Sequence, residues 1–97
     1  RLAFEVRADQ PNKFAIGLNS SAAEVEIKGG PEWQHVSFAS SDFLNATNEP
    51  LKDWTDIMEL RLSAKESLSE KTSKREVGGK WQGSAPQFRN LRWVVGD

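Results

Sequence analysis

The sequence alternates between apolar and polar side chains along several short segments. In residues 2–8 the apolar side chains of Leu2, Phe4 and Val6 occupy every second position, which is typical of a β-strand with one buried face. The same pattern predicts strands over residues 2–8, 14–18, 24–28, 33–38, 59–63 and 88–95. Turn-forming residues at 9–12, 19–21 and 29–31 separate the first of these segments. Because no amphipathic helix of crossover length lies between them, the order of elements predicts an all-β fold, an antiparallel β-sandwich.

Two segments depart from the alternation. Apolar residues recur at steps of three and four over residues 51–58, which favours one helical turn or a coiled corner before the strand at 59–63. Residues 64–80 contain only two sizeable apolar side chains, Leu68 and Val77. Such a segment buries too little surface to hold itself in place, so we expect a long, mobile polar loop with some helical character before the last strand.

The alternation also predicts which side chains lie inside. In residues 14–18 the large side chains point inward, and the small Ala15 and Gly17 face away from the core or lie beneath something packed close to the strand. Near the end of the chain the expected inward side chains are Leu60, Leu62, Leu91 and Trp93.

Length and composition limit the classes of function. A chain of 97 residues has enough apolar surface for one core, so we expect a single domain over residues 1–97. The 13 basic and 14 acidic residues nearly cancel, which argues against nucleic acid as a partner. The apolar runs are far shorter than the roughly 20 residues of a membrane helix, and the chain has no cysteine for disulfides or thiolate chemistry. The sequence enters a strand pattern at Arg1, which we interpret as a piece excised from a larger protein.

Four segments together resemble a known family. They are Leu-Ala-Phe-Glu-Val-Arg at 2–7, Trp-Gln-His-Val-Ser-Phe at 33–38 running into Ser-Asp-Phe at 41–43, Leu-Lys-Asp-Trp-Thr-Asp-Ile at 51–57 leading into Glu-Leu-Arg-Leu at 59–62, and Phe-Arg-Asn-Leu-Arg-Trp at 88–93. In their order they resemble the galactose-binding-like carbohydrate-binding modules. The resemblance implies a jelly-roll β-sandwich that accompanies secreted bacterial polysaccharide-active enzymes, with a polysaccharide or oligosaccharide and the parent enzyme's domains as partners. Family members are usually longer and often end on an Asp-containing strand, so a terminal strand is missing or the variant is unusually compact.

The sequence lacks a recognisable catalytic set. His35 is the only histidine, and no Gly-x-Ser-x-Gly elbow, phosphate-binding glycine loop or distinctive pair of carboxylates accompanies it. We therefore expect a domain that is not an enzyme and that needs no cofactor. Hard oxygen ligands lie close together in the sequence and would suit a structural calcium ion, although their spacing does not follow an EF-hand and an ordinary polar corner is the favoured interpretation: Asp42, Asn45, Asn48, Glu49, Asp53 and Asp56.

The four tryptophans fall into two groups. Trp33, Trp54 and Trp93 lie in or beside apolar patterns and are expected in the core. Trp81 lies between glycines and polar residues, so its indole could offer a flat surface on which a sugar ring stacks, with Gln82 binding the hydroxyls. In the alternative interpretation Trp81 folds back as a lid over one end of the sandwich.

Polar side chains on the outward positions of the strands form the other candidate surface: Glu5, Arg7, His35, Glu59, Arg61, Asn90 and Arg92. Arginine forks suit the carboxylates of uronic acids or the sulfates of algal polysaccharides, whereas the alternative is a solvated face with cross-strand ion pairs. The predicted ligand-binding residues are thus Trp81, Gln82, His35, Arg61, Arg92 and Glu59. The expected function is a non-catalytic carbohydrate-binding module. The alternative is a ligand-free structural or interaction domain, in which Trp81 would be buried.

Overall fold

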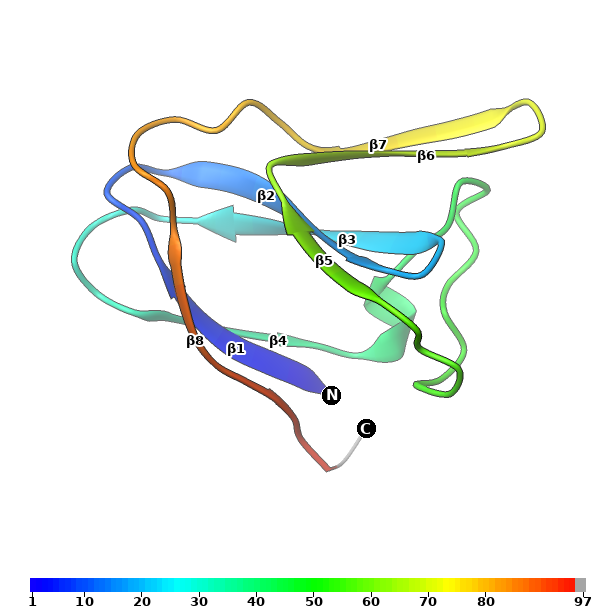
Figure 1. Ribbon diagram of the computed structural model, residues 1–97, viewed down its shortest axis with the longest axis horizontal. Helices are drawn as coiled ribbons and strands as arrows, with labels where there is room; N and C mark the ends of the chain where they lie inside the picture. The colour runs from blue at the N-terminus through cyan, green and yellow to red at the C-terminus, as the bar shows by residue number, and fades with distance from the viewer. Residues whose placement is uncertain (96–97) are drawn as a thin grey trace.

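The computed structural model describes residues 1–95, and its regular structure consists of β-strands and one short 3-10 helix (Figure 1). In chain order the elements are β1 (Leu2–Arg7), β2 (Asn12–Leu18), β3 (Ser21–Ile27), β4 (Gln34–Phe38), η1 (Ser40–Asp42), β5 (Leu60–Ser63), β6 (Lys65–Glu70), β7 (Ser73–Gly78) and β8 (Gln87–Trp93). Every strand predicted from the alternation is present, with its ends moved by a few residues, and all pairings are antiparallel. The described part of the chain has no helix with the length and apolar character needed to cross a lipid bilayer.

Two antiparallel sheets enclose the core. Strands β4, β1 and β8 form one sheet in that order, and β3, β2 and β5 form the other. The two sheets lie face to face in a sandwich-like arrangement, with β1 and β2 as the central strands (Figure 1). The large side chains of the central strands fill the space between the sheets and are buried, as the alternation predicts: Leu2, Phe4, Val6, Phe14, Ile16 and Leu18.

An aromatic cluster links the two sheets. The ring centroid of Phe4 lies 6.4 Å from that of Phe14, 6.3 Å from Phe38 and 5.9 Å from Phe88. The rings meet at tilted and edge-on angles, an arrangement that benefits from the aromatic quadrupole in addition to burial. Because these residues come from β1, β2, β4 and β8, the cluster packs strands of both sheets against each other.

A polar corner follows β4 and returns the chain to the core. The Asp42 carboxylate accepts a hydrogen bond of 2.8 Å from the Ala39 N–H and thereby closes the turn of η1. The next residue, Phe43, is fully buried, with its ring 5.3 Å from Phe38 and 6.0 Å from Trp54. The short helix thus redirects the chain so that Phe43 closes one end of the core.

The segment at 64–80 is not a mobile loop, and the prediction for it was wrong. Its two halves are β6 and β7, which pair over six positions from Lys65↔Gly78 to Glu70↔Ser73. This hairpin packs on the outer face of the β3–β2–β5 sheet, where Leu68 and Val77 form a small second core with Ala15, Ala22 and Ala46.

Small residues under the hairpin explain how so few apolar groups hold it. Ala15 and Gly17 do lie beneath something packed close, as the sequence suggests: a Cβ atom on Gly17 would meet the Glu66 carboxylate and the Arg61 guanidinium at less than contact distance. Arg75 adds a second attachment, because its Nη1 donates hydrogen bonds of 2.8 Å to the carbonyls of both Ala22 and Leu44.

The sandwich is closed along one side and open along the other. On the closed side the Gln34 side chain of β4 donates to the Glu26 carbonyl of β3 at 2.9 Å and accepts from the Lys28 N–H at 3.2 Å. On the other side lie the strands β5 and β8, each paired along one edge only. We call this side the open seam; it contains a hollow of about 340 Å³ lined by residues that include Phe14, Leu62, Trp81 and Phe88.

Several side chains expected in the core lie at the open seam instead. Leu62, Leu91 and Trp93 are 38%, 51% and 54% exposed, because β5 is short and no further strand among residues 1–95 covers β8. The ring of Trp93 packs edge-on against Trp54, with 4.9 Å between the ring centroids. The corner at 51–58 is a turn with no helix; Leu51, Trp54 and Ile57 pack on the core from it, as expected for Trp54, and Met58 faces outward.

Candidate functional site

The predicted ligand-binding residues occupy three separate places. Trp81 and Gln82 lie in the segment between β7 and β8, beside the start of β2. Arg61 lies on the outer side of β5 and contacts Glu66 of β6, and Glu59, just before β5, pairs with Arg61. His35 and Arg92 lie on the outer face of the β4–β1–β8 sheet, on strands that flank β1. The fold therefore does not bring the six residues together.

Trp81 is not an open stacking platform. Its indole packs edge-on against Phe14 at 6.3 Å and its Nε1–H donates a hydrogen bond of 2.8 Å to the Ser84 carbonyl. The side chain is half-buried against the main core. This geometry corresponds to the lid interpretation, in which the indole covers one end of the sandwich.

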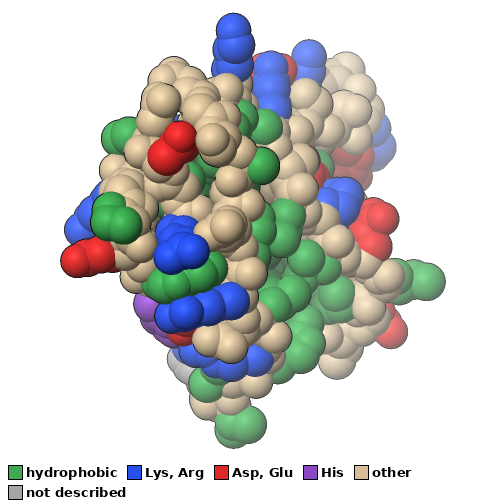
Figure 2. All heavy atoms as spheres, turned by 60° about the vertical axis from the view of Figure 1, so that its left-hand side comes forward, with side chains coloured by type: hydrophobic (Ala, Val, Ile, Leu, Met, Phe, Trp, Pro, Cys, Tyr) green, Lys and Arg blue, Asp and Glu red, His purple; other side chains and the backbone are tan. Residues whose placement is uncertain are grey.

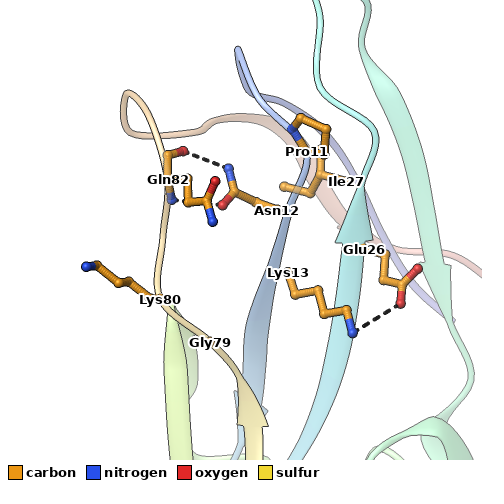
Figure 3. A pocket seen from close by; sticks show the side chains of 8 residues that line it. All are labelled: Pro11, Asn12, Lys13, Glu26, Ile27, Gly79, Lys80 and Gln82. Carbon is orange, nitrogen blue, oxygen red and sulfur yellow. Dashed lines mark hydrogen bonds and ion pairs between the residues drawn. The ribbon is translucent and has the colours of Figure 1, made fainter.

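The neighbouring Gln82 is fixed through its backbone. Its N–H donates to Asn12 Oδ1 at 2.9 Å and its carbonyl accepts from Asn12 Nδ2 at 2.8 Å (Figure 3). A shallow hollow of about 390 Å³ lies beside this pair, and its opposite wall carries the Lys13–Glu26 ion pair, 3.7 Å between the charged atoms. Lys80 points away from the other residues that line the hollow (Figure 3). Among the residues that line the hollow, Lys13 and Glu26 pair with each other and Lys80 points away, so no unpaired charge is directed into it.

Arg61 is already saturated by carboxylates. Its guanidinium forms a 2.9 Å ion pair with Glu66, which is largely buried, and a second with Glu59. The hydrogen bond to Glu66, and secondarily the charges of Glu66 and Glu59, raise the pKa of Arg61 above its usual value. Glu66 was not predicted as its partner, since the segment containing it was expected to be a loop. The pair serves to attach the hairpin to β5, which leaves little capacity for a ligand.

The outer face of the β4–β1–β8 sheet collects most of the remaining candidates. The strand register places His35 opposite Glu5, and Arg92 opposite Ala3 on the other side of β1. Figure 2 shows the histidine beside a group of Lys and Arg side chains on this part of the surface. We call this surface the arginine face; it consists of Glu5, Arg7, Trp33, His35, Arg89 and Arg92.

Trp33 lies on the arginine face and not in the core, so its predicted position was wrong. The carbon centres of two guanidinium groups, Arg7 and Arg89, lie 4.5 Å and 4.2 Å from the centre of its ring. The sequence contains the signal for this position: Trp33 has the parity of His35, opposite to that of Val36 and Phe38, which face the core. The prediction placed Trp33 in the core because tryptophan is usually buried, although its position along the strand points outward.

A bulge in β8 brings Asn90 and Arg92 to the same face as Arg89, which lies directly opposite Glu5. Opposite β1 the register shifts between Ala3 and Glu5, and Asn90 takes a left-handed backbone conformation with φ of 57°. Arg89 donates to the Glu5 carboxylate at 2.8 Å from its place opposite Glu5, and the bulge lets Asn90 reach the same carboxylate at 3.0 Å. The bulge has no clear signal in the sequence, because asparagine is common in turns of many kinds.

Glu5 organises the centre of the arginine face. Hydrogen bonds from Arg89 and then Asn90 lower the pKa of its carboxyl group, with a smaller contribution from the charges of Arg89 and Arg92. Its second oxygen lies 3.8 Å from Nδ1 of His35. Glu5 is therefore the carboxylate that positions Arg89, whereas Arg7 and Arg92 form no ion pair within residues 1–95.

The acidic residues considered for calcium serve local turns. Asp42 binds the Ala39 N–H, Asn45 accepts from the N–H groups of Thr47 and Glu49, and Asp53 accepts from Thr55. Across residues 1–95 no group of three or more acidic or histidine side chains is arranged to hold a metal ion. The ordinary polar corner is the interpretation that accounts for these contacts.

Comparison of the chain with models of protein families, with curated proteins and with solved structures gives no significant match. The resemblance to galactose-binding-like modules thus stays a prediction.

Proposed function

We propose that the chain is a non-catalytic carbohydrate-binding module with the jelly-roll topology, and that its ligand site is the arginine face. One observation carries the proposal: Arg7 and Arg89 are held on Trp33 on an exposed sheet face, with hydrogen-bond donors left over. His35 and Arg92 belong to this site as the sequence suggests. The proposed partners are a polysaccharide or oligosaccharide and the neighbouring domains of a secreted, polysaccharide-active parent protein.

The chemistry of this face suits an extended sugar chain. Guanidinium groups donate hydrogen bonds in a fixed plane, and the oxygens along a polysaccharide are spaced acceptors. The contributing side chains stand on paired strands, so their positions are fixed by the sheet. The face is open and shallow, so affinities of micromolar to millimolar order are expected.

Affinity electrophoresis tests the proposal. The protein is run through gels that contain neutral or acidic plant and algal polysaccharides, and at least one of them should retard it. Arg7→Gln and Arg89→Gln should reduce the retardation. Lys74→Gln removes the same charge from the exposed hairpin, and is the matched control that should leave the retardation unchanged. Equal migration in every gel would reject the function.

A second candidate function is a ligand-free interaction domain. The open seam favours it, because two strand edges there lack a partner and Leu62, Leu91 and Trp93 are exposed between or beside them. Figure 2 shows hydrophobic side chains gathered in a hollow between the two layers. The packing of Trp81 on Phe14 also supports this candidate, which requires a buried indole.

The occupant that fits the open seam is an extended segment of another polypeptide that adds to β8. Backbone groups along a strand edge bind a further strand, and apolar side chains at every second position would cover Leu91 and Trp93. The positions between them would lie near Arg89 and Arg92, which favours acidic residues. A synthetic peptide of alternating Val and Glu should protect the β8 amides from hydrogen exchange, and one of alternating Val and Lys should not. Equal protection, or none, would reject this candidate.

A further inference from the structure

We propose that the arginine face selects anionic sugar residues, with Arg7 and Arg89 each donating hydrogen bonds to the carboxylate of a uronic acid or to a sulfate ester. The inference rests on the proposed function and specifies the chemical class of its ligand. The two groups share one chemistry, a cluster of oxygens carrying negative charge that accepts hydrogen bonds from a planar fork.

The first argument is the way in which the two arginines are anchored. Arg7 uses Nε to donate to Gln87 Oε1 at 2.6 Å, and Arg89 uses Nε to donate to Glu5 Oε1 at 2.8 Å. Within residues 1–95 neither arginine uses a terminal Nη group in a hydrogen bond. Each guanidinium is thus held by its inner nitrogen and keeps its terminal donors for a ligand.

The second argument is the role of Trp33. Both guanidinium groups lie over its ring, at distances where the cation–π attraction is strong. The indole is therefore already engaged and acts as a support for the two arginines. Since their side chains are ordered before binding, less conformational entropy is lost when an anion arrives.

The third argument is the charge balance. Glu5 neutralises Arg89 in part, whereas Arg7 and Arg92 have no carboxylate partner in the described residues. Arg92 donates from Nη1 to the Asn90 carbonyl, which fixes the group without neutralising it. A face with excess positive charge on two strands suits a polymer that carries repeated anions, because several weak contacts then act together.

The same features disfavour nucleic acid as the polyanion. Single-stranded nucleic acids need free aromatic faces on which bases stack, and Trp33 is covered by guanidinium groups. The chain as a whole has a formal charge of −1, so it provides no long-range attraction for a polyphosphate.

Affinity electrophoresis and titration calorimetry with defined probes test the inference. The probes are polygalacturonate for carboxylates, dextran sulfate for sulfates, dextran and xylan as neutral polymers, and oligo(dT) for phosphate. We expect one of the acidic polysaccharides to bind at least tenfold more tightly than the neutral polymers, and the affinity to fall as NaCl is added. Arg7→Gln and Arg89→Gln should each weaken this binding about tenfold or more, since each removes a charge-assisted hydrogen bond.

Two further variants separate a built site from general charge. Trp33→Ala keeps every charge but removes the support of both arginines, and should weaken binding several-fold without lowering the melting temperature appreciably. Lys74→Gln on the hairpin removes one charge and should change the affinity less than twofold. If Lys74→Gln weakens binding as much as Arg7→Gln does, the arginine face is not the receptor.

Three other binding results would overturn the inference, and one of them would also overturn the proposed function. Equal binding of neutral and acidic polymers would overturn the inference and leave the proposed function intact. Failure of all polysaccharides to bind would overturn both. Binding of oligo(dT) that is stronger than that of either acidic polysaccharide, and that is lost in Arg89→Gln, would show that the face recognises phosphate polymers and would overturn the inference.

Discussion

Replacing Leu68 by alanine tests the packing of the β6–β7 hairpin. Leu68 is 8% exposed and packs with Val77 over the alanines of β2 and β3. The substitution deletes three carbon atoms, each worth about 0.8 kcal/mol when buried, so the expected loss is about 2 kcal/mol before any cavity term. Because the neighbouring side chains are mostly alanines, they cannot move in to fill the space, and we expect a loss of about 2–3 kcal/mol.

Urea and thermal unfolding monitored by tryptophan fluorescence measure this loss. For a domain of this size a change of 1 kcal/mol moves the melting temperature by about 4–8 °C, so Leu68→Ala should lower it by about 10–20 °C. Ser69→Ala is the matched control, because Ser69 is exposed on the opposite side of the same strand and should change stability by less than about 0.5 kcal/mol.

An effect of Leu68→Ala as small as that of the control would refute the reasoning. The segment would then behave as the mobile loop that its composition suggests. Hydrogen exchange gives an independent measure: the amides paired between β6 and β7 should be protected in the unaltered protein and should lose protection in Leu68→Ala.

Three other perturbations have defined outcomes. Phe43→Ala should cost about 3–5 kcal/mol in urea unfolding, because its ring is fully buried at the end of the core; a cost below 1 kcal/mol would contradict that position. Arg89 and Asn90 lower the pKa of Glu5 in the folded state, so the stabilisation from its ionised carboxylate is present above the unfolded pKa and is lost as the pH falls through the lower folded value. The difference in unfolding free energy between the unaltered protein and Glu5→Gln should therefore shrink between neutral pH and about pH 2, and a constant difference would be evidence against the contact. Trp81→Phe should remove a blue-shifted component of the emission, because the indole packs on Phe14; loss of a red-shifted component would place the indole in water.

The strands were predictable because their signal is local. Alternation in residues 2–8 and 14–18 reflects burial of one face of each strand. The buried faces of these two strands pack against each other and form the core. Even the small residues Ala15 and Gly17 indicated a closely packed neighbour. The identity of that neighbour was not predictable, because Leu68 and Val77 bury little by themselves and become a core only above alanines from two other strands.

The candidate site was harder to predict because it depends on tertiary geometry. The outward position of Trp33 follows from its parity with His35, but a tryptophan at the start of a strand suggests burial. The bulge at Asn90, which no spacing in the sequence announces, brings Arg92 onto the same face as Arg89 although the two stand three residues apart. Arg61 was correctly placed on the outside of its strand, yet its pairing with Glu66 required a hairpin that composition argued against.

The outer faces of the two sheets differ in whether another element covers them. The β6–β7 hairpin occupies the outside of the β3–β2–β5 sheet, whereas none of the described residues 1–95 forms a layer over the outside of the β4–β1–β8 sheet (Figure 1). The proposed ligand site is the exposed side of a single sheet, so a linker that pressed it against a neighbouring domain would block access of the ligand without altering any contact inside the molecule.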